Sequence, residues 1–255
     1  IELLCGERIM TENLWRPEPS TGKVVVLAGI APGFGATVAS RFVHAGYRVA
    51  GLARSREFGG QLEAELSDQG GSYRHFACDV TEPGSVAGAI DTIARDLGIP
   101  NVLIYNPMKL IVKPFQDLAI DDFEAVWRVT CLGAAIAAQA VLPHMLDAGS
   151  GTIVLTGATA SIKGSSRFAS LASAKFALRG LAQSLAREYG SRGVHVVHTV
   201  LDGLIWGPQT TARFNADREK CLEPEAIAET YLQLVRQHRS AWTHEIDLRP
   251  SGEQF

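Results

Sequence analysis

The stretch Gly29-Ile30-Ala31-Pro32-Gly33-Phe34-Gly35 joins a short apolar run to a longer run with helical periodicity. The run before it, residues 24–27, is continuously apolar, as expected for a parallel strand that is covered on both faces. The run after it, residues 36–45, stops at Gly46, a common helix terminator. Glycines at such a junction let the backbone turn tightly and approach a pyrophosphate, which then rests on the helix N-terminus. The stretch therefore predicts a dinucleotide-binding turn, and a tight turn without a ligand is the alternative interpretation.

The rest of the chain continues this alternation of strands and helices. Strands that alternate with helices imply right-handed crossovers and a doubly wound parallel sheet. We therefore expect one α/β domain of the Rossmann type, with about seven parallel strands and helices on both faces. The predicted strands cover residues 24–27, 47–53, 72–78, 101–105, 152–156, 194–201 and 245–248, and the predicted helices cover residues 36–45, 61–67, 85–97, 121–146, 168–189 and 223–238.

Two segments are predicted to lie outside this regular pattern. Residues 1–22 are expected to form an N-terminal arm, and residues 23–255 the dinucleotide-binding and catalytic domain. Met10 is one candidate for the natural start of the chain, with the residues before it added upstream. Residues 203–222 are expected to be irregular and to form a mobile lid, because they contain glycine, proline and threonine.

Composition excludes several classes of protein. The formal net charge of -3 argues against a nucleic-acid partner, because phosphate binding requires a basic surface. We expect no apolar run to reach the ~20 residues that cross a bilayer, and therefore no membrane segment. The first residues are too few and too acidic for a signal peptide, which favours a cytoplasmic protein. The four cysteines lie far apart without a CxxC pair, so we expect reduced thiols and no metal site; they are Cys5, Cys78, Cys131 and Cys221.

The spacing Gly-x-x-x-Gly-x-Gly resembles that of the short-chain dehydrogenase/reductase family, and the resemblance extends over nearly the whole chain from Lys23 onward. The motif Cys78-Asp79-Val80-Thr81 is similar to the family's acidic residue after the third strand, which implies that Asp79 binds the adenine amino group. The motif Tyr105-Asn106-Pro107-Met108 stands at the family's Asn-Asn-Ala-Gly and matches it at Asn106. The resemblance thus implies cofactor contacts from Gly29, Gly33, Phe34, Gly35, Asp79, Val80 and Asn106.

The end of the second predicted strand indicates which nicotinamide cofactor is bound. An acidic residue there would hold the adenosine ribose hydroxyls and repel a 2′-phosphate. The sequence instead reads Ala53-Arg54-Ser55, and a guanidinium can pair with phosphate through two hydrogen bonds. We therefore predict NADP(H) in preference to NAD(H), with Arg54 and Ser55 as contacts. The alternative is a solvated Arg54, and Pro32 stands where many NADP-preferring relatives carry a basic residue.

The resemblance also implies a set of catalytic groups, most of which this sequence lacks. The family uses a Tyr-x-x-x-Lys pair on one helix, a serine after the fifth strand and an asparagine on the preceding long helix. Lys175 matches the lysine, which binds the cofactor ribose and lowers the tyrosine pKa. Leu171 stands at the tyrosine position, Ala158 at the serine and Thr130 at the asparagine. A shift of one residue would place Thr159 at the serine position, and this alternative stays open.

No small shift restores the missing tyrosine, because none occurs between Tyr105 and Tyr189. Lys175 is then either a ribose ligand or an ordinary solvated helix lysine. Asp202 follows the sixth predicted strand, and a partly desolvated carboxylate there would have a raised pKa and act as acid or base. Capping of the following loop is the alternative role for Asp202. The catalytic candidates are therefore Lys175, Asp202 and Thr159.

Three functions follow from this combination of a cofactor site and an incomplete catalytic set. The first is an NADP(H)-dependent oxidoreductase that acts on a carbonyl or alcohol through a non-standard site. The second is a redox-neutral isomerase, cyclase or dehydratase, and the third is a non-catalytic NADP(H)-binding subunit. Ala158 and Leu171 make the pocket apolar, which favours an apolar small-molecule substrate. The alanine-rich helices at residues 121–146 and around Lys175 form the subunit interface in relatives, so a homodimer or homotetramer is expected.

Overall fold

Strand β1 (Val24–Ala28) is buried along its whole length and lies inside a sheet of seven parallel strands. The computed structural model describes residue 15 and residues 18–252. The strands follow the order β3-β2-β1-β4-β5-β6-β9, and the predicted doubly wound parallel sheet is confirmed. The other six strands are β2 (Arg48–Ala53), β3 (Tyr73–Ala77), β4 (Pro100–Tyr105), β5 (Gly151–Thr156), β6 (Val194–Leu201) and β9 (Glu245–Leu248).

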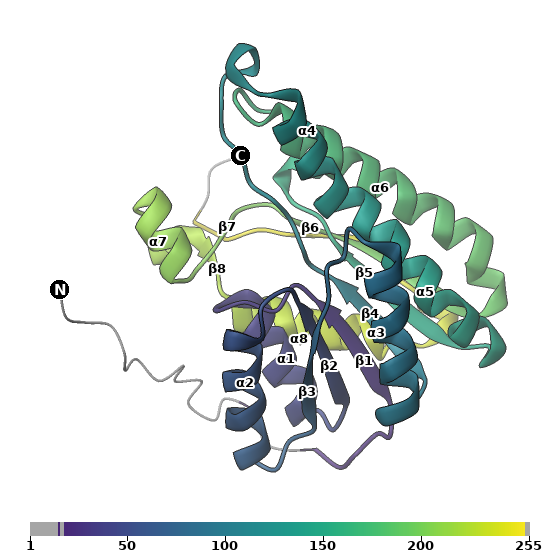
Figure 1. Ribbon diagram of the computed structural model, residues 1–255. Helices are drawn as coiled ribbons and strands as arrows, with labels where there is room; N and C mark the ends of the chain where they lie inside the picture. The colour runs from purple at the N-terminus through teal and green to yellow at the C-terminus, as the bar shows by residue number, and fades with distance from the viewer. Residues whose placement is uncertain (1–14, 16–17, 253–255) are drawn as a thin grey trace.

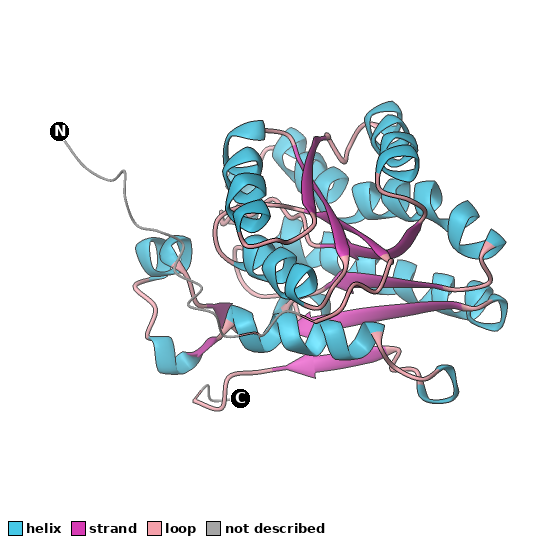
Figure 2. Ribbon diagram, turned by 90° about the horizontal axis from the view of Figure 1, so that it is seen from below, coloured by secondary structure: helices cyan, strands magenta, loops and turns pink. Residues whose placement is uncertain are grey.

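Helices cover both faces of the sheet, which explains why β1 is continuously apolar. Val24 and Val26 point into one hydrophobic core, whereas Val25 and Leu27 point into the other. Figures 1 and 2 show the sheet between the two helical layers. One layer contains α1 (Phe34–His44), α2 (Arg56–Asp68) and α8 (Pro224–Val235), and the other contains α3 (Pro83–Asp96), α5 (Gly133–Asp147) and α6 (Ala169–Tyr189).

The helix predicted at residues 121–146 is present, but it is not regular throughout. It consists of α4 (Ile120–Trp127), a π-helical segment (Arg128–Leu132) and α5, which contains Pro143. By length and composition, the span Ile120–Asp147 is apolar enough to cross a membrane, so the expectation that no segment reaches this length was wrong. The expectation was based on unbroken apolar runs. The mean hydropathy of this span is high although polar residues are scattered along it. Half of its most apolar window is buried inside the fold, and core helices pass the same test, so the span is weak evidence for membrane insertion.

Residues 203–222 are more ordered than the sequence predicted. They contain β7 (Leu204–Ile205), α7 (Pro208–Phe214) and β8 (Cys221–Leu222), and the two short strands pair with each other. Pro208 occupies the first turn of α7, where its missing N–H is not needed, and Asn215 ends the helix in a left-handed conformation. The expectation of an irregular segment was therefore wrong, because Pro208 and Asn215 are compatible with the start and the end of a short helix. In Figure 1, α7 projects from the rest of the fold.

The predicted N-terminal arm falls largely outside the described residues, which exclude residues 1–14, 16 and 17, and with them Cys5 and Met10. The described part of the arm lies against the first helical layer. Glu18 forms ion pairs with Arg41 of α1 and Arg236 after α8, at 3.5 and 2.8 Å. The backbone N–H of Thr21 donates to the Gly46 carbonyl at 2.8 Å.

Candidate functional site

The carboxyl ends of the parallel strands meet at one edge of the sheet, and the predicted site residues lie at these ends. β1 pairs with β2 on one side and with β4 on the other. Successive strands are added on the β2 side up to β3 and on the β4 side afterwards, so the strand order reverses beside β1. Ligands of open α/β sheets bind in the crevice at such a switch point. The residues that follow successive strands there are the glycine turn, Arg54, Asp79, Asn106, Gly157 and Asp202.

The glycine turn after β1 requires glycine at each of its three positions. Gly29 and Gly33 both have φ of 92°, a conformation that side chains rarely adopt. A Cβ on Gly35 would overlap the carbonyl oxygen of Gly29, so only glycine permits this close helix–strand approach. Gly33 is the N-cap of α1 without a side-chain cap, and a Cβ placed on it would meet nothing within 4 Å. The open space beside uncapped N–H groups fits the pyrophosphate of a dinucleotide.

The neighbours of this turn hold it against the sheet. The Phe34 ring packs edge-on against Tyr231 of α8, with ring centroids 5.7 Å apart. The Tyr231 hydroxyl lies 2.9 Å from Thr156 Oγ1 and 2.7 Å from Thr199 Oγ1, so it links the turn to β5 and β6. The backbone N–H of Asn106 donates to the carbonyl of Ala28 at 3.2 Å and places Asn106 beside the turn. Asn106 therefore lies beside the start of the glycine turn, whereas Phe34 packs against α8 at its end.

Arg54 and Ser55 follow β2 at the same edge. Arg54 is exposed, so its guanidinium is accessible to a ligand. Ser55 is the N-cap of α2, and its Oγ accepts a hydrogen bond from the Glu57 N–H at 3.2 Å. This cap starts α2 at Arg56, earlier than the predicted residue 61. Ser55 Oγ only accepts in this cap, so its O–H group is able to donate to a ligand.

Asp79 and Val80 follow β3. The Asp79 carboxylate accepts hydrogen bonds from Thr81 N at 2.9 Å and Thr81 Oγ1 at 2.7 Å. These two bonds, together with the positive charge of Arg54, hold the pKa of Asp79 below its ordinary value. Val80 is partly buried against the start of α5. A Cβ placed on Gly133 would lie 3.0 Å from the Val80 carbonyl oxygen. Asp79 is therefore a fixed, ionised acceptor at the edge that carries the glycine turn.

Lys175 on α6 is buried, with 1% of its surface exposed. Its Nζ donates a hydrogen bond to the Thr156 carbonyl at 2.5 Å. Burial lowers the pKa of Lys175 to about 7, because desolvation disfavours the charged ammonium. The alternative of a solvated helix lysine is excluded by this burial. An ammonium that titrates near neutrality is suited to exchange protons or to bind a ribose hydroxyl.

Leu171 and Ala158, which the resemblance assigns to the tyrosine and serine positions, lie together in apolar surroundings. Leu171 is 5% exposed and belongs to a small hydrophobic cluster with Val126 and Ala172. Ala158 packs against this cluster, whereas Thr159 starts a short 3-10 turn after it. Thr130 lies in the π-helical segment, fully buried, and its Oγ1 has no hydrogen-bond partner among the described residues.

Asp202 lies at the end of β6 and is 8% exposed. Its Oδ2 forms an ion pair with Arg249 Nη1 at 2.8 Å. The ion pair favours the ionised form of Asp202, so it supports a role as base more than one as proton donor.

A group that sequence reasoning missed lies behind Lys175. His198 on β6 is fully buried, and its Nδ1 is 2.9 Å from Glu245 Oε2 on β9. Glu245 also accepts two hydrogen bonds from Arg179 of α6, at 2.7 and 2.6 Å. Burial lowers the pKa of His198 to about 4 against the opposing effect of Glu245, and the Arg179 hydrogen bonds hold the pKa of Glu245 below its ordinary value. Arg179 stands one helical turn after Lys175 on α6, but no local sequence signal connects them to His198 on β6 and Glu245 on β9.

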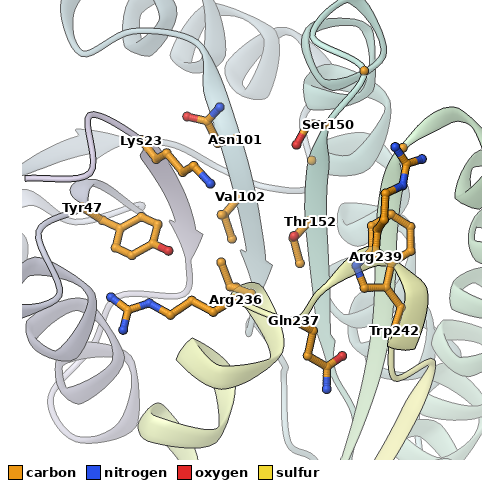
Figure 3. Close-up of a pocket in the computed structure, with 14 residues that line it drawn as sticks. Lys23, Tyr47, Asn101, Val102, Ser150, Thr152, Arg236, Gln237, Arg239 and Trp242 are labelled. Atoms are coloured by element: carbon orange, nitrogen blue, oxygen red, sulfur yellow. The ribbon is translucent and has the colours of Figure 1, made fainter.

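A separate hollow of about 380 Å³ lies at the opposite, amino-terminal edge of the strands (Figure 3). Lys23 precedes β1, Tyr47 precedes β2 and Asn101 lies at the start of β4. Arg236 and Arg239 reach it from the segment after α8. This hollow is therefore distinct from the edge that carries the glycine turn.

The chain resembles known proteins over most of its length. A family model described as short chain dehydrogenase matches residues 23–217. A D-threitol dehydrogenase of Mycolicibacterium smegmatis is 33% identical over 175 residues, which cover 69% of this chain and 67% of that protein. A 3-alpha-(or 20-beta)-hydroxysteroid dehydrogenase of Mycobacterium tuberculosis is 31% identical over 189 residues, which cover 74% of this chain and 71% of that protein.

Solved structures show the same fold. A short-chain dehydrogenase from Rhodopseudomonas palustris has a TM-score of 0.79 and 31% identity, and the match covers 90% of this chain and 99% of that chain. A metagenomic short-chain oxidoreductase in complex with NADP has a TM-score of 0.80 and 24% identity, with 91% of this chain and 99% of that chain covered. The second likeness supports the fold alone.

Proposed function

Because the chain belongs to the short-chain dehydrogenase family, we propose that it binds NADP(H) in preference to NAD(H) and is an oxidoreductase with a non-standard active site. The substrate group is a carbonyl or an alcohol. The glycine turn carries this proposal, because its three glycines are each required and its uncapped helix N-terminus is open to a pyrophosphate. The proposed cofactor contacts are Gly29, Gly33, Phe34, Gly35, Arg54, Ser55, Asp79, Val80, Asn106 and Lys175.

When bound, NADP(H) supplies or accepts the hydride. The N–H groups at the start of α1 bind its pyrophosphate, and the exposed Arg54 binds its 2′-phosphate. Lys175, whose ammonium donates to the Thr156 carbonyl, would bind the ribose through its remaining N–H groups. Leu171 and Ala158 exclude water from the face where the substrate lies, and they orient it without transferring a proton. The remaining catalytic candidates, Thr159 and Asp202, border this face at the ends of β5 and β6.

Titration of NADPH onto the protein tests the cofactor proposal through the change in NADPH fluorescence. Ala31 is exposed inside the glycine turn, so Ala31→Glu adds a carboxylate beside the pyrophosphate without disturbing the core. We expect this variant to bind NADPH about five- to tenfold more weakly, from charge repulsion near the surface. Ala31→Gln has the same size without the charge and is expected to bind as the parent does. Equal affinities for both variants, or no fluorescence change with the parent, would refute the proposed site.

The choice between the two cofactors is tested at Arg54. Arg54→Asp removes the cation that faces the 2′-phosphate and adds a repelling carboxylate, so the ratio of NADPH to NADH affinity is expected to fall roughly 10- to 100-fold. Arg192→Asp makes the same change of charge before β6, at the opposite edge of the sheet, and serves as the control. An unchanged ratio in Arg54→Asp, or an equal fall in Arg192→Asp, would contradict the preference for NADP(H).

A redox-neutral reaction or a non-catalytic role is the second candidate, and the apolar cluster around Leu171 and Ala158 favours it. The same cluster leads us to propose an apolar small-molecule substrate. NADPH oxidation in the presence of ketones, aldehydes or quinones identifies the oxidoreductase. NADPH binding without oxidation by any of these compounds supports the second candidate.

We further propose a homodimer or homotetramer in the cytoplasm, with residues 23–255 as one unit preceded by an arm at residues 1–22. The exposed aromatic side chains of Trp127 on α4 and Phe176 on α6 support assembly through these helices, at 37% and 45% exposure.

A further inference from the structure

The hollow at the amino-terminal edge of the sheet is lined mainly by polar and basic residues (Figure 3). It lies where α8 ends at Val235, so this helix does not cover the strands there. None of the described residues that line it is an aspartate or a glutamate, whereas Lys23, Arg236 and Arg239 are basic. Three cations around one hollow, with no carboxylate in its lining, favour an anionic ligand.

Two of these three cations are available to a ligand. Arg236 is engaged, because its Nη2 forms an ion pair with Glu18 at 2.8 Å and donates to the Ala45 carbonyl at 3.5 Å. Such a contact is expected where a helix ends, since basic side chains bind the last carbonyls of helices. Lys23 and Arg239 are exposed, and neither forms an ion pair in the part of the chain that the structure describes. Lys23 and Arg239 are therefore the two free cations of the hollow.

A hydroxyl group lies between these two cations (Figure 3). Thr152 is the second residue of β5, and in the sheet register it stands between Val102 of β4 and His195 of β6. The residue is 8% exposed, and its Oγ1 has no hydrogen-bond partner among the described residues. Buried hydroxyl groups are usually paired. Because Thr152 lines the hollow, we expect a ligand there to supply the missing partner.

The wall that carries Arg239 is braced by contacts of its own. Trp242 stacks on His195, with ring centroids 4.8 Å apart and an angle of 5° between the ring planes. The Arg239 guanidinium lies over the Trp242 ring, 5.9 Å from its centroid. The Gln237 amide donates to Thr243 Oγ1 and accepts from the Thr243 N–H, both at 2.8 Å. The wall therefore has its shape before a ligand binds, which lowers the cost of binding.

The donors around the hollow fit carboxylates better than phosphate. Phosphate sites usually collect several free backbone N–H groups. The N–H groups of residues 149–151, which form the turn before β5, instead donate to backbone carbonyls at 3.0–3.2 Å. The groups that remain are an ammonium, a guanidinium and a hydroxyl, and each of these donates readily to a carboxylate.

The two free cations lie on opposite sides of the hollow (Figure 3). Lys23 precedes β1, whereas Arg239 lies beside β6, which is three strands away in the order β1-β4-β5-β6. Neighbouring strands are about 4.8 Å apart, so β1 and β6 are separated by roughly 14 Å. A ligand with two carboxylates binds both sides at once, whereas a monocarboxylate binds only one.

We propose that this hollow is a binding site for a small organic di- or tricarboxylate, held by Lys23, Arg239 and the Thr152 hydroxyl. Its volume of about 380 Å³ accommodates a molecule the size of citrate. The site is separate from the glycine turn, because the two lie at opposite ends of the parallel strands. It is therefore independent of the proposed function.

Isothermal titration calorimetry of the full chain with citrate, at pH 7 and constant ionic strength, tests this proposal. We expect saturable binding of citrate to a single site and about tenfold weaker binding of acetate, which offers only one carboxylate. Inorganic phosphate is expected to bind more weakly than citrate. Absence of saturable citrate binding would overturn the proposal, and phosphate binding as tight as that of citrate would overturn the ligand class.

Two variants of Thr152 test the role of the hydroxyl. Thr152→Val removes it at nearly constant shape, and valine is favourable in a strand, so citrate affinity is expected to fall about fivefold without loss of the fold. Thr152→Ser keeps the hydroxyl and is expected to bind citrate within about twofold of the parent. An unchanged affinity in Thr152→Val, or an equal fall in both variants, would count against the hydroxyl as a ligand contact.

The cations are tested by neutral substitutions. Lys23→Gln and Arg239→Gln are each expected to weaken citrate binding about tenfold, because each removes one charge-assisted contact. Lys163→Gln removes an exposed lysine that follows β5 at the opposite edge, and it should leave citrate binding unchanged. An unchanged affinity in either Lys23→Gln or Arg239→Gln, or an equal fall in Lys163→Gln, would contradict the proposed contacts.

The variant Ala31→Glu separates this site from the cofactor site. It adds a carboxylate at the glycine turn, so it is expected to weaken NADPH binding and to leave citrate binding unchanged. Loss of citrate binding in Ala31→Glu would place citrate at the glycine turn and overturn the proposal. A parent that binds citrate in the hollow but binds no NADPH would refute the proposed function and leave the carboxylate site standing.

Discussion

Replacement of Lys175 by methionine is expected to raise the melting temperature by about 10 °C at pH 7. The ammonium is 1% exposed, and burial lowers its pKa from 10.5 to about 7. Between these two pH values the unfolded chain binds a proton that the folded chain does not, so folding is penalised by about 4 kcal/mol at pH 7 and below. Methionine has a similar volume and no charge. For a chain of this size, 1 kcal/mol corresponds to roughly 2–4 °C.

The pH dependence of this effect distinguishes it from better packing. The penalty in the parent disappears as the pH rises from about 7 toward 10.5, because the lysine loses its proton in both states. The difference in melting temperature between Lys175→Met and the parent is therefore expected to shrink over this window and to be constant below it. Differential scanning fluorimetry at pH 6 to 10 measures both curves. Lys163→Met removes an exposed lysine and should change neither. A lower melting temperature for Lys175→Met at pH 7, or a gain independent of pH, would contradict the burial argument.

The double variant Leu171→Tyr, Ala158→Ser introduces the two side chains that the proposed non-standard site lacks, and it is expected to increase NADPH-dependent reduction of a responsive ketone or aldehyde about 100-fold. Leu171 lies four residues before Lys175 on α6, and Ala158 packs against the same cluster. A tyrosine there is one helical turn from the ammonium, and a general acid contributes about 10²–10⁴ in rate. The initial rate of NADPH oxidation, measured at 340 nm with saturating cofactor, is the readout.

The matched control for this experiment is the double variant Leu171→Phe, Ala158→Ser. Phenylalanine fills the same space as tyrosine without its hydroxyl, so this variant reports the effect of shape and of the serine alone. Equal rates for the two double variants would show that proton donation does not limit the reaction. The single variant Ala158→Ser separates the contribution of the serine hydroxyl.

The topology could be predicted from the sequence because each strand has one dominant local signal. β1 is apolar at every position, as expected for a strand that is covered on both faces of the sheet. The glycine turn marks its junction with α1. The start of α2 was harder to predict, because it depends on the Ser55 cap and serine is also a common loop residue. The helix α7 was missed because the proline and glycine that usually mark loops here form its start.

The candidate site could be predicted where its residues follow a strand end or share one helix. Lys175 and Leu171 share a helix, so their relation follows from the sequence alone. His198 and Glu245 come from strands that are far apart in the chain, and their contact depends on the β6–β9 register. The ion pair between Asp202 and Arg249 depends on the same register. Nothing in the sequence alone indicates that the Asp202 carboxylate is paired.

Because Glu245 lies on the last strand, it is synthesised after the residues that it contacts. Strands β1 to β6 and helix α6 are synthesised first, so the ribosome delivers Lys175, Arg179 and His198 before their carboxylate partner. Until β9 joins the edge of the sheet, Arg179 has no Glu245 to bind and His198 Nδ1 has no acceptor there. A nascent chain that stops before β9 would bury His198 Nδ1 without its acceptor and leave Arg179 without its carboxylate, which disfavours early closure of this half of the fold. The contacts of Glu245 with Arg179 and His198 can therefore form only after translation has passed residue 245.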